Sequence, residues 1–266
     1  MTAREVAAMI EAWAPLSIQE TWDNAGFCVG LPQTPVRGVL LCLDVTPQVI
    51  EESLDLGANM IISHHPLIFH GFKQLCGQDK VARMVAWAIK SDLVIYSSHT
   101  NADKVASGVS GVMAEALGLQ HVAVLDPDEQ HHTGSVVGLG LVGDLPAPQE
   151  TYSFLQMVKR VFCLSSLRVS AEFVPTVHRV AVCGGSGSPL IPQAWERGAD
   201  IFLSGDIGYH HFFSLDKKEK KMMIADIGHY ESEIGIVQKF ARMLSEKNVN
   251  FAIHTTKCNT NPIQYL

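Results

Sequence analysis

Five side chains of the sequence have the types and spacings that bind metal ions: His64, His65, Asp103, His229 and Glu233. His64 and His65 are adjacent, and because successive side chains of an extended segment point to opposite faces, the pair suits two ions, one each. His229 and Glu233 are four residues apart, which places them on one face of a helix with their Cβ atoms about 5–6 Å apart. Three imidazoles and two carboxylates suit Zn, Mn, Fe or Co better than calcium. We therefore expect two divalent metal ions per chain.

A pair of divalent ions supports hydrolytic chemistry. Two ions about 3.5–4 Å apart lower the pKa of a bridging water and stabilise an attacking and a leaving oxygen together. The residues therefore predict a metal-dependent hydrolase that acts on a small molecule. The same ligands would equally serve a two-metal phosphatase or phosphodiesterase. A non-enzymatic protein with a structural or stored metal pair is the third hypothesis, and it predicts a closed metal shell, since catalytic sites keep an open position.

Two further histidines, His99 and His210, are candidates for proton transfer, because imidazoles titrate near neutral pH. His99 has two alternative roles: it could orient a ligand or the nucleophilic water, or it could be a turn histidine bonded to the backbone. His210 lies four residues after Asp206, and this pair is open to either an acid–base role or an orienting role.

Other residues near these motifs are weaker candidates for a role in the site. Glu231 would replace Glu233 as a ligand if the helix began later, although its two-residue offset from His229 points it elsewhere. Asn24, in the sequence WDNAG, is interpreted as a turn residue. The run Gly184–Gly187 matches neither GxGxxG nor the Walker A motif, so we interpret it as a tight turn rather than a phosphate-binding loop. No role is assigned to His131, His132 and His254.

The candidate ligands follow directly on apolar segments of strand length. The motifs SHHP, SHTNAD, SGD and DIGHYESE each come at the end of such a segment, as in MIISHHP and LVIYSSHTNAD. In open α/β sheets, side chains from several strands converge at the carboxyl ends of the strands. We therefore expect the four motifs to contribute to one site.

The alternation of apolar strands with amphipathic helices predicts an α/β protein with largely parallel sheets, since parallel strands need crossover helices. The rhythm breaks between about His121 and Ala147, where the sequence contains DPDEQHH, several glycines and a pair of prolines. We therefore predict two linked α/β halves. Residues 1–125 would supply His64, His65 and Asp103, and residues 126–266 would supply His229 and Glu233.

Composition excludes several classes of protein. The chain has 266 residues, 47% of them hydrophobic, and a formal net charge of -7, which provides no electrostatic footprint for nucleic acid or an anionic membrane. Its first residues lack the pattern of a signal peptide, and no apolar stretch approaches the roughly 20 residues of a membrane span. The six cysteines are far apart and form no CxxC pair. We expect reduced thiols in a cytoplasmic protein.

Several of these motifs together resemble a known family. WDNAG, LDVTPQVIEES, SHHP, SHTNAD, SGDIGYHH and GHYESE occur in this order from Glu20 to the C-terminus. In this respect the chain resembles the GTP cyclohydrolase I type 2 family, also called the Nif-three-like dinuclear-metal-centre family. The family often has TGD, with Lys before the Tyr-His pair, where this chain has Ser204-Gly205-Asp206 and Gly208. The candidate ligands are unaffected by this departure.

The resemblance implies a fold, an assembly and a ligand assignment. It implies two intertwined α/β domains, in the short form without an inserted middle domain, and a toroidal homohexamer. It makes His65 and Asp103 ligands of one metal, His64 and His229 ligands of the other, and Glu233 the bridge. The implied reaction is the ring-opening hydrolysis of GTP in pterin formation, so the expected substrate is a small molecule, and a nucleotide in particular.

Overall fold

The computed structural model describes residues 1–76, 79–130, 136–171, 173–215, 221–247 and 249–265. Contacts divide the chain into two compact units. Unit 1 comprises Met1–Ala102 and Ile236–Pro262, and unit 2 comprises Asp103–Gly235 and Ile263–Leu266. The chain therefore passes from unit 1 to unit 2 at Asp103 and returns at Ile236, whereas the sequence predicts a division near residue 125. The difference places Asp103 in the same unit as His229 and Glu233.

Unit 1 is built on a five-stranded sheet in the order β1-β4-β3-β2-β11. Strands β4, β3, β2 and β11 run parallel, and the edge strand β1 is antiparallel to β4. Nearly every residue of the three central strands is buried, as expected for strands covered on both faces. The strands are β1 (Gly26–Val29), β2 (Gly38–Cys42), β3 (Met60–Ser63), β4 (Val94–Ser97) and β11 (Ala252–Thr255).

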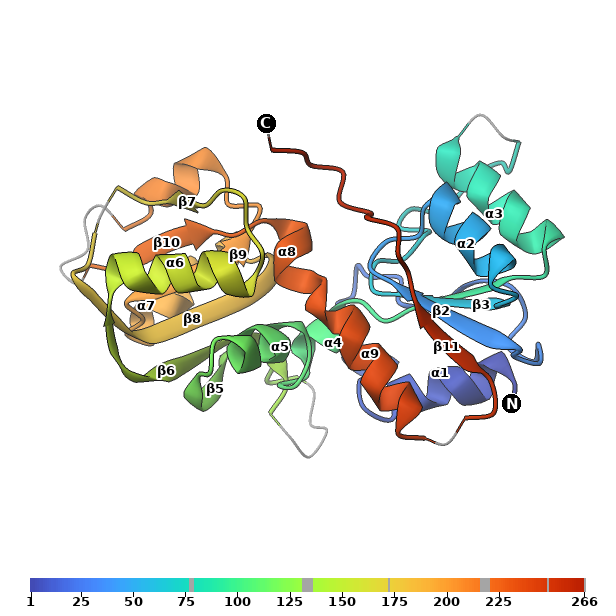
Figure 1. Cartoon of the computed structure of the whole chain (residues 1–266), viewed down its shortest axis with the longest axis horizontal. Coiled ribbons are helices and arrows are strands. Elements are labelled where there is room, and N and C mark those ends of the chain that lie inside the picture. Colours follow the sequence, from blue (N-terminus) through green and yellow to red (C-terminus); the bar gives the residue numbers. More distant parts are fainter. Residues whose placement is uncertain (77–78, 131–135, 172, 216–220, 248, 266) are drawn as a thin grey trace. The chain divides into compact units, whose positions relative to one another are not determined.

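Helices cover both faces of this sheet (Figure 1). One face packs against α2 (Pro47–Asp55) and α3 (Lys80–Lys90), whose apolar side chains share a core with β2, β3 and β4. On the other side, Trp13 at the end of α1 (Ala3–Glu11) meets Phe240 of α9 (Gly235–Ser245) edge-on at 6.2 Å. The first helix begins at a capping box, in which Thr2 and Glu5 satisfy each other's backbone N–H groups.

Unit 2 is built on a six-stranded mixed sheet in the order β5-β6-β8-β9-β10-β7. Strands β8, β9 and β10 form a parallel centre, and β5, β6 and β7 pair antiparallel around it. The strands are β5 (Gln120–Pro127), β6 (Gly138–Glu150), β7 (Arg168–Val169), β8 (Thr176–Ser186), β9 (Ile201–Gly205) and β10 (Met223–Asp226).

Two separate apolar cores hold the helices of unit 2 on opposite faces of its sheet. One core joins the sheet to α5 (Val109–Ala116) and α6 (Thr151–Val161), and the other joins it to α7 (Ile191–Glu196). The short elements are the 3-10 segments Ser188–Leu190 and Tyr209–Phe213 (η3), and the helix α8 (His229–Glu233). A further short helix, α4 (Thr100–Lys104), contains the residue at which unit 2 begins.

The predicted α/β fold class is confirmed, with two sheets that each have a parallel centre. Within the stretch between about His121 and Ala147, residues 121–127 lie on β5 and residues 138–147 lie on β6. These two strands pair antiparallel, and α6 follows directly on β6. The glycines and prolines of the stretch concealed this pair, because β6 is irregular where Pro146 and Pro148 interrupt it, and its register with β8 shifts between Asp144 and Gln149.

The sheets place polar residues at the carboxyl ends of neighbouring parallel strands. In unit 1, Ser63 at the end of β3 pairs with Ser97 at the end of β4, so the residues that follow both strands lie at one edge. In unit 2, Ser204 of β9 pairs with Asp226 of β10 in the same way. The predicted strand-end positions are therefore brought together within each unit by strand register.

All six cysteines are free thiols, as the sequence predicts. In the part of the chain that the structure describes, we find no helix with both the length and the apolar character needed to cross a membrane.

The packing of α9 leads to a stability prediction. Phe240 is fully buried, so Phe240→Ala removes its contact with Trp13 and leaves a cavity. We expect the free energy of unfolding to fall by about 3–5 kcal/mol, measured by urea denaturation. Ile89→Ala, at a side chain that is 54% exposed, is the control and should change it by less than about 0.5 kcal/mol. Equal effects of the two substitutions would contradict the assignment of α9 to the core of unit 1.

Candidate metal centre

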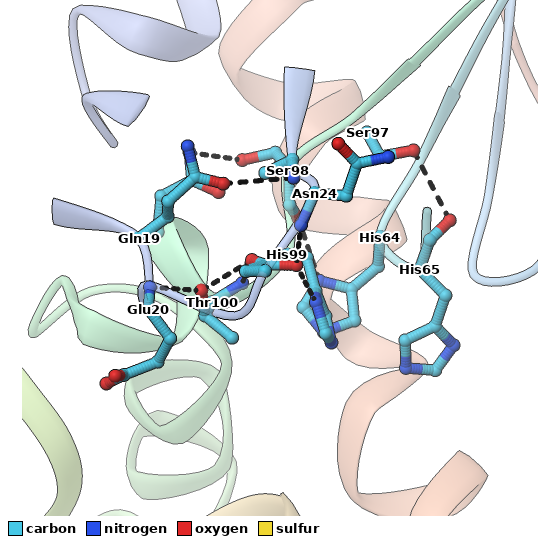
Figure 2. Close-up of polar contacts among 12 residues, drawn as sticks. Gln19, Glu20, Asn24, His64, His65, Ser97, Ser98, His99 and Thr100 are labelled. Atoms are coloured by element: carbon cyan, nitrogen blue, oxygen red, sulfur yellow. Dashed lines mark hydrogen bonds and ion pairs between the residues drawn. The ribbon is translucent and has the colours of Figure 1, made fainter. Parts of the chain in front are cut away.

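Three histidines of unit 1 form a cluster at the carboxyl ends of its parallel strands. His64 and His65 follow β3, and His99 follows β4. One ring nitrogen of each lies within 4.8 Å of the others, and the ring centroids are 4.9 to 5.4 Å apart. Figure 2 shows the three imidazoles beside one another, below the strand-end residues Ser97 and Ser98. The sequence predicted His64 and His65 as ligands and left the role of His99 open.

Hydrogen bonds to Nδ1 orient the first two imidazoles. The Nδ1 atom of His64, a fully buried residue, lies 2.9 Å from the carbonyl oxygen of Ser98. A carbonyl only accepts, so Nδ1 carries the proton and Nε2 carries the lone pair. The Nδ1 atom of His65 lies 2.7 Å from the carboxylate of Asp44, which also accepts a hydrogen bond from Thr260. Histidine ligands of metal ions are held in this way, with the second nitrogen bonded to a carbonyl or carboxylate.

A buried carboxylate, Asp23, holds the third imidazole. It lies 2.8 Å from Nδ1 of His99 and also accepts from the backbone N–H and the hydroxyl of Thr100. Burial alone would raise the pKa of Asp23, but the hydrogen bonds from His99 and Thr100 outweigh it and lower the pKa to about 2. Asp23 therefore stays ionised and fixes the tautomer of His99. Sequence reasoning treated the WDNAG segment as a turn and missed this residue.

Hydrogen bonds also fix the backbone at His65. The hydroxyl of Ser63 donates to the carbonyl of His65 at 2.7 Å and lies 2.9 Å from the hydroxyl of Ser97. Asn24, which the sequence placed in a turn, donates from its side chain to the carbonyl of Ile68 at 2.6 Å. These contacts fix the segments on which the histidines stand.

Unit 2 repeats the same arrangement around His229. This residue opens α8, where its Nδ1 lies 2.8 Å from the carboxylate of Asp206 and its Nε2 lies 3.1 Å from Oε2 of Glu233. The four-residue spacing therefore puts His229 and Glu233 together as the sequence predicts. Asp206, which directly follows β9, orients the imidazole.

Asp103 and Glu233 contribute two carboxylates to unit 2, where Asp103 is half-buried and Glu233 is buried. Glu233 is only 3% exposed. Burial raises the pKa of the Cys183 thiol, and the charges of Asp103 and Glu233 raise it further, which places both carboxylates near this residue. Buried carboxylates are costly unless a cation compensates them. Together with the imidazole of His229, they are donors of the kind that borderline divalent ions prefer.

Because Gly185 has no Cβ atom, the carboxylate of Glu233 can occupy the space beside it. The φ angle of Gly185 is +61°, and a Cβ atom added there would lie 2.2 Å from Oε1 of Glu233. Its backbone N–H donates to the hydroxyl of Ser232 at 2.9 Å. Within the run Gly184–Gly187, this glycine thus accommodates the carboxylate, a role that the sequence pattern did not indicate.

The remaining candidates lie elsewhere. His210 is exposed on η3, with its ring centroid 5.3 Å from that of Tyr209. The carboxylate of Glu231 approaches Gly228, where an added Cβ would lie 2.1 Å from Oε2 of Glu231, and its charge raises the pKa of Tyr265, second to burial. His131 and His132 lie outside the described residues.

Comparison with known proteins places the chain in a family. Residues 1–262 match the Duf34/NIF3 (NGG1p interacting factor 3) family. The chain belongs to this family. It is 31% identical over 247 residues to a Clostridium perfringens protein named GTP cyclohydrolase 1 type 2 homolog, covering 93% of this chain and 92% of the relative. A Streptococcus pneumoniae protein of the same name is 31% identical over 274 residues, with both chains fully covered.

A solved structure supports the same assignment. The crystal structure of a Staphylococcus aureus protein matches with a TM-score of 0.89 and 27% identity, over 100% of this chain and 99% of that chain. The resemblance inferred from the motifs is thereby confirmed. Family members in this comparison carry names that call them homologs of a GTP cyclohydrolase, and the described residues include histidine and carboxylate groups that could bind a metal ion.

Replacement of Asp23 tests the support of His99. Asp23→Asn removes the charge that accepts from His99 and Thr100, so we expect a loss of about 1–3 kcal/mol in the free energy of unfolding at pH 7. The folded pKa of about 2 lies below the reference value of 3.8, so the stabilisation by Asp23 is present above about pH 4 and is lost as the pH falls toward 2. Urea denaturation from pH 2 to 7 should show a shallower pH dependence in the variant.

The matched control for Asp23 is Asp55→Asn, at an exposed residue of α2. It should leave both the stability at pH 7 and its pH dependence within about 0.5 kcal/mol of the wild type. An Asp23→Asn variant that behaved like this control would show that the carboxylate does not hold His99.

Gly185→Ala tests the space beside Glu233. The added methyl would clash with the carboxylate, and the positive φ angle disfavours alanine. We expect metal content to fall by at least half, measured by elemental analysis of the folded protein after dialysis against zinc. Gly57→Ala, at another positive φ angle but with no atom within 4 Å of the added Cβ, controls for backbone strain. Full metal content in Gly185→Ala would contradict the proposed contact.

Proposed function

We propose that the chain binds two divalent metal ions and uses them to hydrolyse a small molecule. In this proposal His65 and Asp103 are ligands of one ion, His64 and His229 are ligands of the other, and Glu233 bridges them. The ligand assignment follows the family resemblance, and the local geometry of each unit supports it separately.

The observation that carries the proposal is the shared orientation of the histidines. In unit 1, the Nδ1 atoms of His64 and His65 are held by a carbonyl and by a carboxylate. In unit 2, the Nδ1 atom of His229 is held by Asp206. Each bond sets the lone pair on Nε2, and a carboxylate partner also makes the imidazole a better donor to a metal ion. A histidine that binds no metal ion does not require a hydrogen bond that fixes its tautomer.

Bound divalent ions would lower the pKa of a coordinated water and stabilise the charge that develops on oxygen. The protein groups complete this chemistry. His99, in the tautomer set by Asp23, has Nε2 as the atom that accepts a proton. The rings of Trp22 and Phe69 lie edge-on to that of His99, with centroid distances of 6.1 and 6.4 Å. His99 is therefore a better candidate for the proton-transfer group than the exposed His210.

The proposed reaction is the ring-opening hydrolysis of GTP. Its support is the family resemblance and the names of relatives, which are homologs of GTP cyclohydrolase 1 type 2. The family resemblance also supports a homohexamer, and the free thiols support a cytoplasmic location, as part of the proposal. Light scattering during gel filtration tests the assembly, and a mass near that of a single chain would reject it.

Metal content tests the ligand set. The wild type should hold two ions per chain by elemental analysis after reconstitution and dialysis. Glu233→Gln should lose at least one of them, because the bridge is neutralised. Glu231→Gln is the matched control on the same helix and should keep both ions, since its carboxylate faces Gly228. Loss of metal from the Glu231 variant alone would overturn the assignment.

Activity tests the reaction. Protein reconstituted separately with Zn, Mn, Fe or Co should release formate from GTP and form a pterin precursor. Both products are measured by chromatography. His99→Gln should lower kcat by about 10²- to 10⁴-fold with the metal content unchanged, as expected for the loss of a proton-transfer group. A fully loaded protein that hydrolyses phosphate esters but not GTP would reject the GTP reaction and retain the hydrolase.

A further inference from the structure

The segment that follows β11, residues 256–265, contributes residues to both units, and we call it the terminal segment. Its residues up to Pro262 belong to unit 1, and those from Ile263 onward belong to unit 2. None of its side chains is a predicted metal ligand. Within each unit, however, it contacts a group that holds or directly precedes a candidate histidine ligand.

Hydrogen bonds hold the terminal segment in place within unit 1. The carboxylate of Glu52 on α2 accepts from the hydroxyl of Thr256 and, at 2.9 Å, from the next backbone N–H group. Burial alone would raise the pKa of Glu52, but these hydrogen bonds outweigh it and lower the pKa. Further along, the side chain of Asn259 accepts from the backbone N–H of Asn261 at 3.0 Å, which closes a turn around Thr260. Thr260 is therefore fixed on both sides along the chain.

Thr260 completes the support of His65. Its hydroxyl donates to Oδ2 of Asp44 at 2.9 Å, although the two residues are 216 positions apart in the sequence. The other oxygen of this carboxylate, Oδ1, lies 2.7 Å from Nδ1 of His65. The side chain of Asp44 is 33% exposed, so without Thr260 its carboxylate would be free to turn toward water. Thr260 therefore acts on the imidazole through Asp44.

Tyr265 lies against the start of α8 in unit 2. A Cβ atom added to Gly228, the residue before His229, would lie 3.5 Å from the phenol oxygen of Tyr265. Burial raises the pKa of this phenol, and nearby carboxylates, first Glu231 and also Asp206, raise it further. Gly228 caps α8 without a side-chain hydrogen bond, so this turn depends on packing from outside the helix. Tyr265 supplies part of that packing.

We propose that the terminal segment is a positioning element of the metal centre. In unit 1, Thr260 orients His65 through Asp44. In unit 2, Tyr265 packs on the turn that carries His229. One segment thus supports a histidine ligand of each ion. The inference rests on the proposed function for its link to metal binding, whereas the orientation of the histidines needs no metal.

Thr260→Val tests the first contact, because it keeps nearly the same shape and removes the hydroxyl. We expect zinc affinity, measured by competition with a chelator, to fall by about 3- to 10-fold, below the roughly 10- to 100-fold typical of a direct partner of a metal ligand. Thr260→Ser keeps the hydroxyl and should restore the wild-type affinity. Thr255→Val makes the same change on β11 and is the matched control, which should have no effect.

Tyr265→Ala tests the second contact. It should lower zinc affinity by about threefold or more. In the metal-free protein it should also speed hydrogen exchange in the peptide that contains His229, because the turn loses packing. Tyr265→Phe keeps the ring and should behave like the wild type. Tyr152→Ala, at a 63% exposed tyrosine on α6, is the control and should change neither quantity.

The tautomer of His65 separates this inference from the proposed function. Nitrogen-15 NMR of the metal-free protein at alkaline pH, where imidazoles are neutral, reports which ring nitrogen carries the proton. The wild type should have the proton on Nδ1, and Thr260→Val should give a mixture of tautomers.

A wild type that binds no zinc, with the tautomer and the exchange rate changed in the variants, would reject the proposed function and support the inference. An unchanged tautomer in Thr260→Val, or unchanged exchange in Tyr265→Ala, would overturn the inference whether or not zinc binds. Wild-type zinc affinity in both variants of a protein that binds zinc would overturn it as well.

Discussion

The candidate site depends on the hydrogen bond between a histidine Nδ1 atom and an acceptor in the protein. Ser98, Asp44 and Asp206 supply this acceptor to His64, His65 and His229. Imidazole alone has two tautomers and rotates freely about its side-chain bonds, so it binds a metal weakly until both are fixed. The acceptor fixes the proton on Nδ1 and the lone pair on Nε2. The fold of each unit positions these acceptors.

Parallel strands perform that placement in both units. In unit 1, the register that pairs Ser63 with Ser97 sets the histidines after β3 beside the residues that follow β4. In unit 2, the register of β9 and β10 brings Asp206 to His229. Buried apolar strands hold these ends rigidly, since nearly all of their residues are inaccessible to solvent. Precision at the site therefore comes from the sheets rather than from the loops.

Much of this arrangement was predictable from sequence. Residue types and the four-residue spacing identified His229 and Glu233, and the apolar segments located the strands before the ligands. The acceptors Asp23 and Asp44 were not predictable, because their partners lie 76 and 21 residues away and only the fold brings them together. The role of Gly185 was concealed for the same reason, since its neighbour Glu233 comes from a distant helix. The pair β5 and β6 was missed because prolines and glycines interrupt its pattern.

The central claim is that Nε2 atoms of His64, His65 and His229 bind two metal ions. Anomalous diffraction at the zinc edge, from crystals of the zinc-loaded protein, tests it most directly. We predict two anomalous peaks per chain, one about 2.0–2.1 Å from Nε2 of His65 and the other at that distance from Nε2 of both His64 and His229, with each Nδ1 still bonded to its protein acceptor. A single peak per chain, or a metal bound through Nδ1, would contradict this account.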